Sequence, residues 1–150
     1  NSNYAEAYYI RGLIKSKTEN YAGAVADFTK SLKINPLNAK AYYNRGLAHA
    51  LLDELKQAIA DFDKAIELKS DYAKAYFNRG YWKDVTGDIE GALVDLVKAK
   101  QLNPADKEIY LELAVVYGRN KKMKEACEEL DNAISAGYQI SEELKNEFCK

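Results

Sequence analysis

The chain has few of the residues on which catalysis and metal binding depend. Its 150 residues include one histidine, two cysteines, two prolines and one tryptophan. His49 has no serine, cysteine or acid placed to form a recognisable catalytic group with it, and no metal-ligand spacing of His and Cys appears. Residues 87–91, which read GDIEG, form a turn between helices and not a phosphate-binding loop. We therefore expect neither enzyme activity nor a cofactor.

The chain also lacks a strong charge of either sign and any long apolar run. It carries 22 Lys and Arg against 23 Asp and Glu, a net charge of −1. Such a balance gives no overall field that would attract nucleic acid or an acidic membrane surface. No run approaches the roughly 18 apolar residues of a membrane-spanning helix. We expect no nucleic-acid partner and no membrane insertion.

What the chain does contain is a repeat. Residues 7–12, 41–46 and 75–80 read AYYIRG, AYYNRG and AYFNRG, and their glycines lie 34 residues apart. Ala114 stands where a fourth glycine would fall. An alanine follows each of these four positions after 12 residues, and a large apolar residue follows after 16: Phe28, Phe62, Leu96 and Leu130. A fixed period of this length is typical of a repeat array, in which each unit packs only on its neighbours.

Each unit is predicted to contain two helices joined by a short polar turn. Asn35-Pro36 and Asn103-Pro104 should end helices, because the residue before proline is pushed out of the helical region. The glycines should lie where the two helices approach closely. We place the units at about 5–38, 39–72, 73–106 and 107–140. A last helix at about 141–149 should begin at the N-cap Ser141 and cover the array with Leu144 and Phe148.

These units resemble the tetratricopeptide repeat family, whose 34-residue pattern runs aromatic, Gly, Ala, large apolar, Ala and Pro. The likeness covers about residues 5–140. It implies an all-α fold, a right-handed α-solenoid of four tandem helix-turn-helix units plus a C-terminal capping helix, as a single domain over 1–150. Two departures stand out: tyrosine replaces the usual tryptophan, and arginine replaces the leucine before each glycine.

The arginines have predicted partners within the chain. Sixteen residues after Arg11, Arg45 and Arg79 come aspartates, at positions 27, 61 and 95. We expect each pair to tie together the two helices of its unit, since the planar guanidinium can bind a carboxylate with two hydrogen bonds. An anion site at the arginines is the functional alternative.

In this family the first helix of each unit lines a concave groove, which implies a scaffold that binds a peptide or protein segment. Periodicity assigns ten residues of this chain to the groove: Tyr9, Lys40, Tyr43, Asn44, Leu47, Lys74, Phe77, Asn78, Tyr81 and Leu111. Asn44 and Asn78, one repeat apart, could bond to the backbone of an extended peptide. The alternative is that these amides are solvated or bond within the array.

Family members that bind chaperone tails hold a terminal carboxylate with five residues in three successive units. Only Asn44 and Lys74 match that set here. Tyr9, Leu13 and Asn78 occupy the other three places. We therefore do not predict chaperone-tail binding.

A different class of function is self-association, with copies stacking through an uncovered first helix into a homo-oligomer. Residues 1–4 align with residues 69–72, the end of the second unit. We expect these four residues to be the tail of a further repeat upstream, in a longer array or a secreted precursor. The alternative is a natural start whose linker happens to match.

Cys127 and Cys149 lie at the start of one predicted helix and the end of the next. If these helices run antiparallel, a disulfide is plausible. The ending also resembles that of some extracytoplasmic bacterial repeat proteins. Two buried free thiols in a cytosolic protein are the alternative. A bonded pair would favour a periplasmic or extracytoplasmic location, and free thiols a cytoplasmic one.

Overall fold

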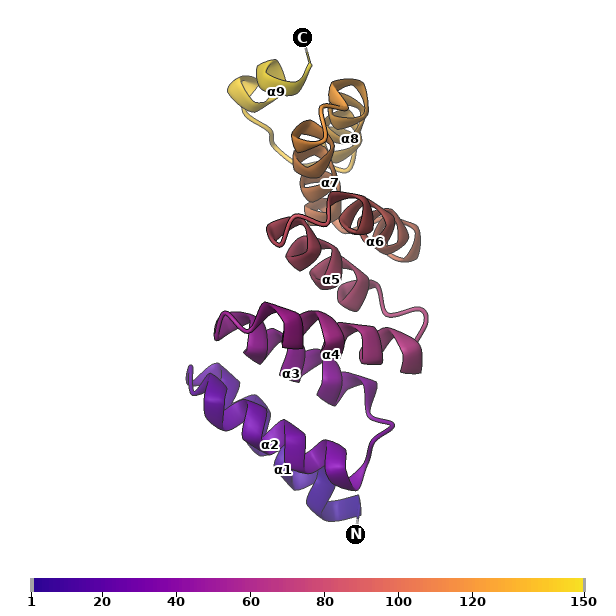
Figure 1. Cartoon of the computed structure of the whole chain (residues 1–150). Coiled ribbons are helices and arrows are strands. Elements are labelled where there is room, and N and C mark those ends of the chain that lie inside the picture. The colour runs from indigo at the N-terminus through magenta and orange to yellow at the C-terminus, as the bar shows by residue number, and fades with distance from the viewer. Residues whose placement is uncertain (1, 150) are drawn as a thin grey trace. The chain divides into compact units, whose positions relative to one another are not determined.

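The computed structural model describes residues 2–149, which form nine α-helices and no strand (Figure 1). The first four are α1 (Ser2–Lys17), α2 (Tyr21–Ile34), α3 (Ala39–Leu51) and α4 (Leu55–Leu68). The next four are α5 (Ala73–Val85), α6 (Ile89–Leu102), α7 (Lys107–Arg119) and α8 (Met123–Ser135), and the last is α9 (Glu142–Phe148). The predicted all-α fold of tandem helix pairs with a final helix is confirmed. Asn1, the first residue of the segment aligned with the second unit's end, lies outside the described residues.

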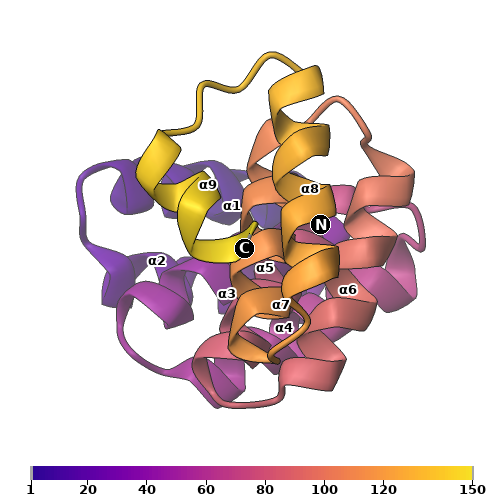
Figure 2. The same ribbon diagram turned by 90° about the horizontal axis from the view of Figure 1, so that it is seen from above.

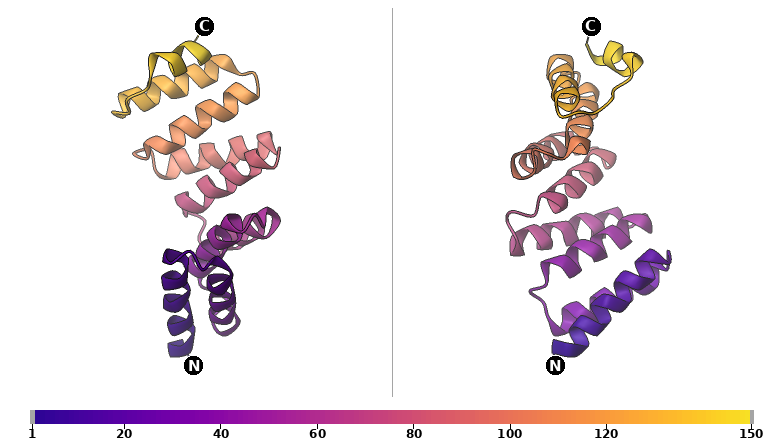
Figure 3. Two further views of the ribbon diagram at one scale, coloured as in Figure 1. Left: turned by 90° about the vertical axis from the view of Figure 1, so that its left-hand side faces the viewer. Right: turned by 180° about the vertical axis from the view of Figure 1, so that it is seen from behind.

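The chain forms two compact units, residues 1–75 and 76–150, here called the N-terminal and C-terminal units. In the N-terminal unit α1 pairs with α2, α3 pairs with α4, and α2 also packs on α3 (Figure 3). In the C-terminal unit α6 packs on α7, and α7 pairs with α8. The expected extent of the single domain and the bounds of the four repeats stay predictions.

The repeated glycines lie where the helices of a pair meet. A Cβ atom at Gly12 would come within 2.7 Å of the Phe28 ring, and one at Gly46 within 2.9 Å of the Phe62 ring. At Gly80 the same atom would lie 2.9 Å from Cγ of Leu96. All are shorter than a carbon–carbon contact allows, so these positions admit only the smallest side chain.

The turn inside each pair repeats with the same period. Glu19, Asp53 and Lys121 have φ values of 60°, 61° and 58°, and Gly87, at the equivalent place, has 89°. The N–H of the residue after each one donates to a carbonyl five residues back at 2.9 Å, as in Asn20 to Lys15. A Schellman helix ending has two hydrogen bonds, and this is the one that spans more residues. It forms around a residue in the left-handed conformation, which explains the positive φ values.

The predicted helix boundaries at the two Asn-Pro pairs and at Ser141 are confirmed. α2 ends at the C-cap Asn35, and α6 ends at the C-cap Asn103. The Ser141 hydroxyl accepts a hydrogen bond from the backbone N–H of Leu144 at 3.2 Å. A serine in this place satisfies one of the N–H groups that the first turn leaves without a helical partner.

All three predicted arginine–aspartate pairs are confirmed, one in each of the first three helix pairs. Arg45 donates to both carboxylate oxygens of Asp61 at 2.6 and 2.8 Å. The equivalent distances are 2.6 and 2.7 Å for Arg11 with Asp27, and 2.5 and 2.7 Å for Arg79 with Asp95. The hydrogen bonds from Arg11 hold the pKa of the Asp27 carboxyl well below its usual range, and Lys15 lowers it further. In the fourth pair Glu129 instead binds Lys100 of α6 at 2.5 Å.

The final helix covers the end of the C-terminal unit (Figure 2). Phe148 is buried and Leu144 is partly buried against an apolar cluster that includes Ala114, Ala126 and Leu130. Gly118 of α7 leaves the space into which the Phe148 ring fits. The predicted covering role of Leu144 and Phe148 is thereby confirmed.

Candidate functional site

In the N-terminal unit, aromatic residues of the first helices are held in place by the second helices. Tyr9 packs on Phe28 and Tyr43 on Phe62, each with ring centroids 5.9 Å apart. Tyr43 also contacts Tyr72, with ring centroids 4.9 Å apart. All three tyrosines are partly buried. Each ring thus has one side anchored in the protein and part of its surface still open to solvent.

Asn44 forms hydrogen bonds within the N-terminal unit. Its Nδ2 group donates to the Tyr9 hydroxyl at 3.2 Å and to the Lys40 carbonyl at 2.7 Å. The Asn44 side-chain Nδ2 group therefore bonds within the array, as one of the alternatives for this amide expected. No described group donates to Oδ1 of Asn44, so the amide keeps an acceptor whose orientation is fixed by the two donor bonds.

Tyr72 lies beside the predicted residues Tyr43 and Tyr9, and the repeat pattern did not identify it. It lies between α4 and α5; its repeat equivalents are Tyr4, Asn38 and Asp106, so an aromatic residue does not recur at this place in every unit. Burial, followed by the neighbouring Tyr43 and Tyr9, raises the pKa of Tyr72 to about 12. Its hydroxyl stays protonated at neutral pH and able to donate.

The remaining predicted residues of this unit lie on first helices too. Leu47 is partly buried on α3. Lys40 on α3 and Lys74 on α5 are exposed.

The C-terminal unit contains a cavity of about 360 Å³ between α5 and α7. It brings together four of the predicted residues, Phe77, Asn78, Tyr81 and Leu111. Its other lining residues are Trp82, Glu108, Glu112 and Val115. The ring of Trp82 stands edge-on to Tyr81, with centroids 4.9 Å apart and planes at 89°.

Three carboxylates and one guanidinium set the charge beside this cavity. Burial raises the pKa of Glu112, the nearby Asp84 raises it further, and Arg119 opposes them. Asp84 is buried and forms an ion pair with Arg119 through Oδ2. Its other oxygen, Oδ1, is buried and has no hydrogen-bond partner among the described residues. The only guanidinium of this group is therefore already paired.

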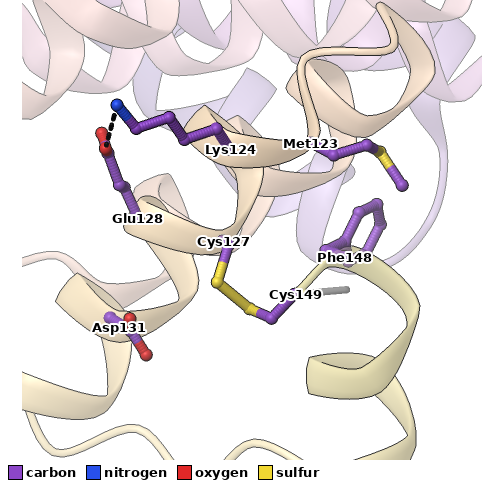
Figure 4. Close-up of a pocket in the computed structure, with 7 residues that line it drawn as sticks. All are labelled: Met123, Lys124, Cys127, Glu128, Asp131, Phe148 and Cys149. Carbon is purple, nitrogen blue, oxygen red and sulfur yellow. Dashed lines mark ion pairs between the residues drawn. A yellow bond between two sulfur atoms is a disulfide. The ribbon is translucent and has the colours of Figure 1, made fainter.

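A second cavity, of about 420 Å³, lies beside a disulfide between α8 and α9 (Figure 4). Cys127 and Cys149 are bonded, with their Cα atoms 5.0 Å apart. Met123, Lys124, Glu128, Asp131 and Phe148 complete the lining. Lys124 and Glu128 lie 3.9 Å apart and are exposed, so their attraction is weak.

Within residues 2–149, no group of three or more His, Cys, Asp or Glu side chains could hold a metal ion. No helix in the described part of the chain is both long and apolar enough to cross a membrane.

Comparison with known families gives two matches. The tetratricopeptide repeat family matches residues 39–72, and a related TPR repeat family matches residues 17–53. No match is found among curated protein sequences.

Solved structures share the fold over most of the chain. A crystal structure of MamA is 24% identical, with a TM-score of 0.88 over 91% of this chain and 80% of that one. The first TPR domain of Spaghetti (RPAP3), bound to the HSP90 peptide SRMEEVD, is 26% identical, with a TM-score of 0.78 over 81% and 96% of the two chains. The TPR domain of OM64 from Arabidopsis is 29% identical, with a TM-score of 0.73 over 81% and 98%.

The 34-residue period, the glycine contacts inside each helix pair and these matches agree. Residues 17–72 match tetratricopeptide repeat families, and most of the chain shares the tandem helix-pair fold of solved tetratricopeptide repeat proteins.

Proposed function

We propose that this chain is a protein-interaction scaffold that binds an extended peptide or protein segment on the face formed by its first helices. The observation that carries the proposal is the cavity between α5 and α7, with its walls of Phe77, Tyr81 and Trp82. Tetratricopeptide repeats are typically interaction modules without catalytic activity. The fold and its solved relatives support that general role.

The aromatic residues suit such a surface for an energetic reason. Tyr9 and Tyr43 already pack against buried rings, so little side-chain freedom remains to be lost when a ligand covers them. Large, pre-anchored aromatic rings dominate the affinity of many interfaces. We expect a single short peptide to bind with a Kd on the order of micromolar, about −8 kcal/mol.

Asn44 would contribute backbone recognition. Its donor group is engaged by Tyr9 and Lys40, and its Oδ1 is left to accept a hydrogen bond from an N–H of the bound segment. A backbone contact of this kind tolerates many ligand sequences, because every non-proline residue offers the same donor.

The solved relative bound to an HSP90 peptide supports peptide binding but not the same ligand. Tyr9, Leu13 and Asn78 stand where chaperone-tail binders place charged or amide groups. We therefore propose an internal peptide segment as the ligand and not a free C-terminal carboxylate.

The test begins with selection from a random peptide library displayed on phage, followed by measurement of Kd for one selected peptide. Tyr81→Ala should weaken binding about tenfold, or about 1.4 kcal/mol, which is more than most interface residues lose on truncation to alanine. The matched control is Val94→Ala on α6, which removes an apolar side chain of which 69% is exposed. Asn44→Ala should also weaken binding, and its matched control is Gln57→Ala on α4, which likewise removes a side-chain amide. Equal losses in test and control variants, with folding retained by circular dichroism, would refute the proposal.

Self-association is the second candidate, favoured by an uncovered apolar face of α1. Ile14 is 57% exposed, whereas its repeat equivalents Ala48 and Val116 are 1% and 0% exposed. Ala48 packs against the preceding helix α2, and Val116 against α6, and α1 has no such cover among the described residues. Sedimentation equilibrium should then show mass rising with concentration, and Ile14→Lys should abolish the rise. A monomer at all concentrations would exclude this candidate.

A further inference from the structure

We infer that the cavity between α5 and α7 binds a cationic side chain, lysine or arginine, of the bound segment. This inference rests on the proposed function and specifies the ligand chemistry at one part of the same surface. It is carried by the shape of the cavity, its aromatic walls and the charge around it.

The walls are suited to a long side chain with a positive end. Phe77, Tyr81 and Trp82 come from one face of α5, and Leu111 and Val115 face them from α7. The apolar stem of lysine or arginine can be buried against such surfaces. The positive head is attracted to the face of an aromatic ring, most strongly to tryptophan.

Two glutamates supply the charge complement. Glu108 and Glu112 lie four residues apart on α7, so they share one face of that helix, and both line the cavity. Glu112 is partly buried, and its pKa is raised by burial and by Asp84. A bound cation would offset both effects and favour the ionised carboxylate.

Among the described residues, neither Arg119 nor Lys107 forms an ion pair with these glutamates. Arg119 pairs with Asp84. Lys107, next to Glu108, donates from Nζ to the carbonyl of Gly137 at 3.3 Å. The group formed by Asp84, Glu108, Glu112 and Arg119 thus keeps an excess of negative charge, which disfavours an acidic or carboxylate ligand and favours a basic one.

Only α7 carries a glutamate at both of these repeat positions, because α1 carries Glu6 at the first and Ile10 at the second. One unit earlier than Glu108 and Glu112, the equivalent positions hold Lys74 and Asn78, and two units earlier Lys40 and Asn44. Selectivity for a basic side chain is therefore expected at the α5–α7 cavity and not at the N-terminal unit.

Trp82 is the only tryptophan of the chain and lines the cavity, so its fluorescence reports on this place alone. The probes are three acetylated and amidated alanine pentapeptides whose central residue is lysine, norleucine or glutamate. We expect the lysine peptide to change Trp82 emission with an affinity about fivefold or more above that of norleucine, with glutamate weakest. Added salt should weaken the lysine peptide selectively.

Variants separate the glutamates from the net charge. Glu112→Gln and Glu108→Gln should each weaken the lysine peptide about fivefold and leave the norleucine peptide unchanged. Glu67→Gln on α4 removes the same charge elsewhere and should have no effect. Equal binding of the lysine and norleucine peptides would overturn the inference and leave peptide binding in place. No response to any of the three would overturn both the inference and the assignment of this cavity to the binding face.

Discussion

Replacing Arg45 by leucine tests what the arginine–aspartate pairs contribute to stability. Only 20% of the Arg45 side chain and 7% of the Asp61 side chain are exposed. Removing one partner of a buried pair strands the other charge, at a cost of about 3–5 kcal/mol. Because His49 Nε2 lies 3.8 Å from Asp61 and Arg45 keeps some solvent contact, we expect the lower end, about 3 kcal/mol.

The assay is urea unfolding followed by circular dichroism. A loss of about 3 kcal/mol should lower the midpoint by about 1–3 M, given an m value of about 1–3 kcal/mol per M. Leucine itself is tolerated at this position, since Leu113 occupies it in the fourth unit and is fully buried. The loss should therefore come from the stranded carboxylate, and Arg45→Leu combined with Asp61→Asn should recover most of it.

Arg11→Leu is the matched control. The Arg11 side chain is 54% exposed, and Asp27 keeps a second partner, Lys15, at 2.8 Å. Its midpoint should therefore fall clearly less than that of Arg45→Leu. Equal shifts in the two variants, or an unchanged midpoint for Arg45→Leu, would refute the reasoning from burial.

Four further outcomes are expected. Gly46→Leu should lower stability by about 2–3 kcal/mol, measured by urea unfolding, because its Cβ would lie 2.9 Å from a buried ring. Lys121→Gly should raise the unfolding midpoint, by about 0.5–1 kcal/mol of stability, because φ is 58° there; a lower midpoint would contradict the left-handed turn. Reducing the Cys127–Cys149 disulfide should cost about 3 kcal/mol in thermal unfolding, and a thiol count in denaturant should rise from none to two on reduction; two reactive thiols beforehand would exclude the bond. Tyr72 has its pKa raised to about 12, so it contributes stability that is present below about pH 10 and lost as the pH rises towards 12. Tyr72→Phe should remove the last phase of the tyrosine absorbance titration, and an unchanged titration would contradict the burial of this hydroxyl.

The fold was predictable because its constraints recur every 34 residues. A glycine facing a buried ring, as at Gly12 and Gly46, leaves the same mark in the sequence each time. The pairing of Arg45 with Asp61 could be predicted for the same reason, since charges that recur in step along a chain are brought together by the same geometry in every unit.

Parts of the site could not be predicted because they depend on neighbours that differ between units. Trp82 stands at a position where Ala48 and Val116 are buried, and nothing in the sequence shows that it lines a cavity instead. The second cations on Asp27 and Asp95, which are Lys15 and Lys83, were also missed, although their spacing of four residues from the arginine is a usable signal.

Among the left-handed turns, only the one at Gly87 carries a glycine as a local signal in the sequence. Glu19 and Lys121 adopt the same backbone without any local signal, because the pairing of the helices imposes it. The period alone would have extended the glycine's conformation to them.

The most direct test of the central claim is a map of backbone amide chemical shifts in ¹⁵N-labelled protein titrated with a library-selected peptide. Binding on the face of the first helices predicts perturbations concentrated around Tyr43, Asn44, Phe77 and Tyr81, with α4 and α6 little affected. Perturbations confined to the exposed sides of α4 and α6, or to α1 alone, would contradict it.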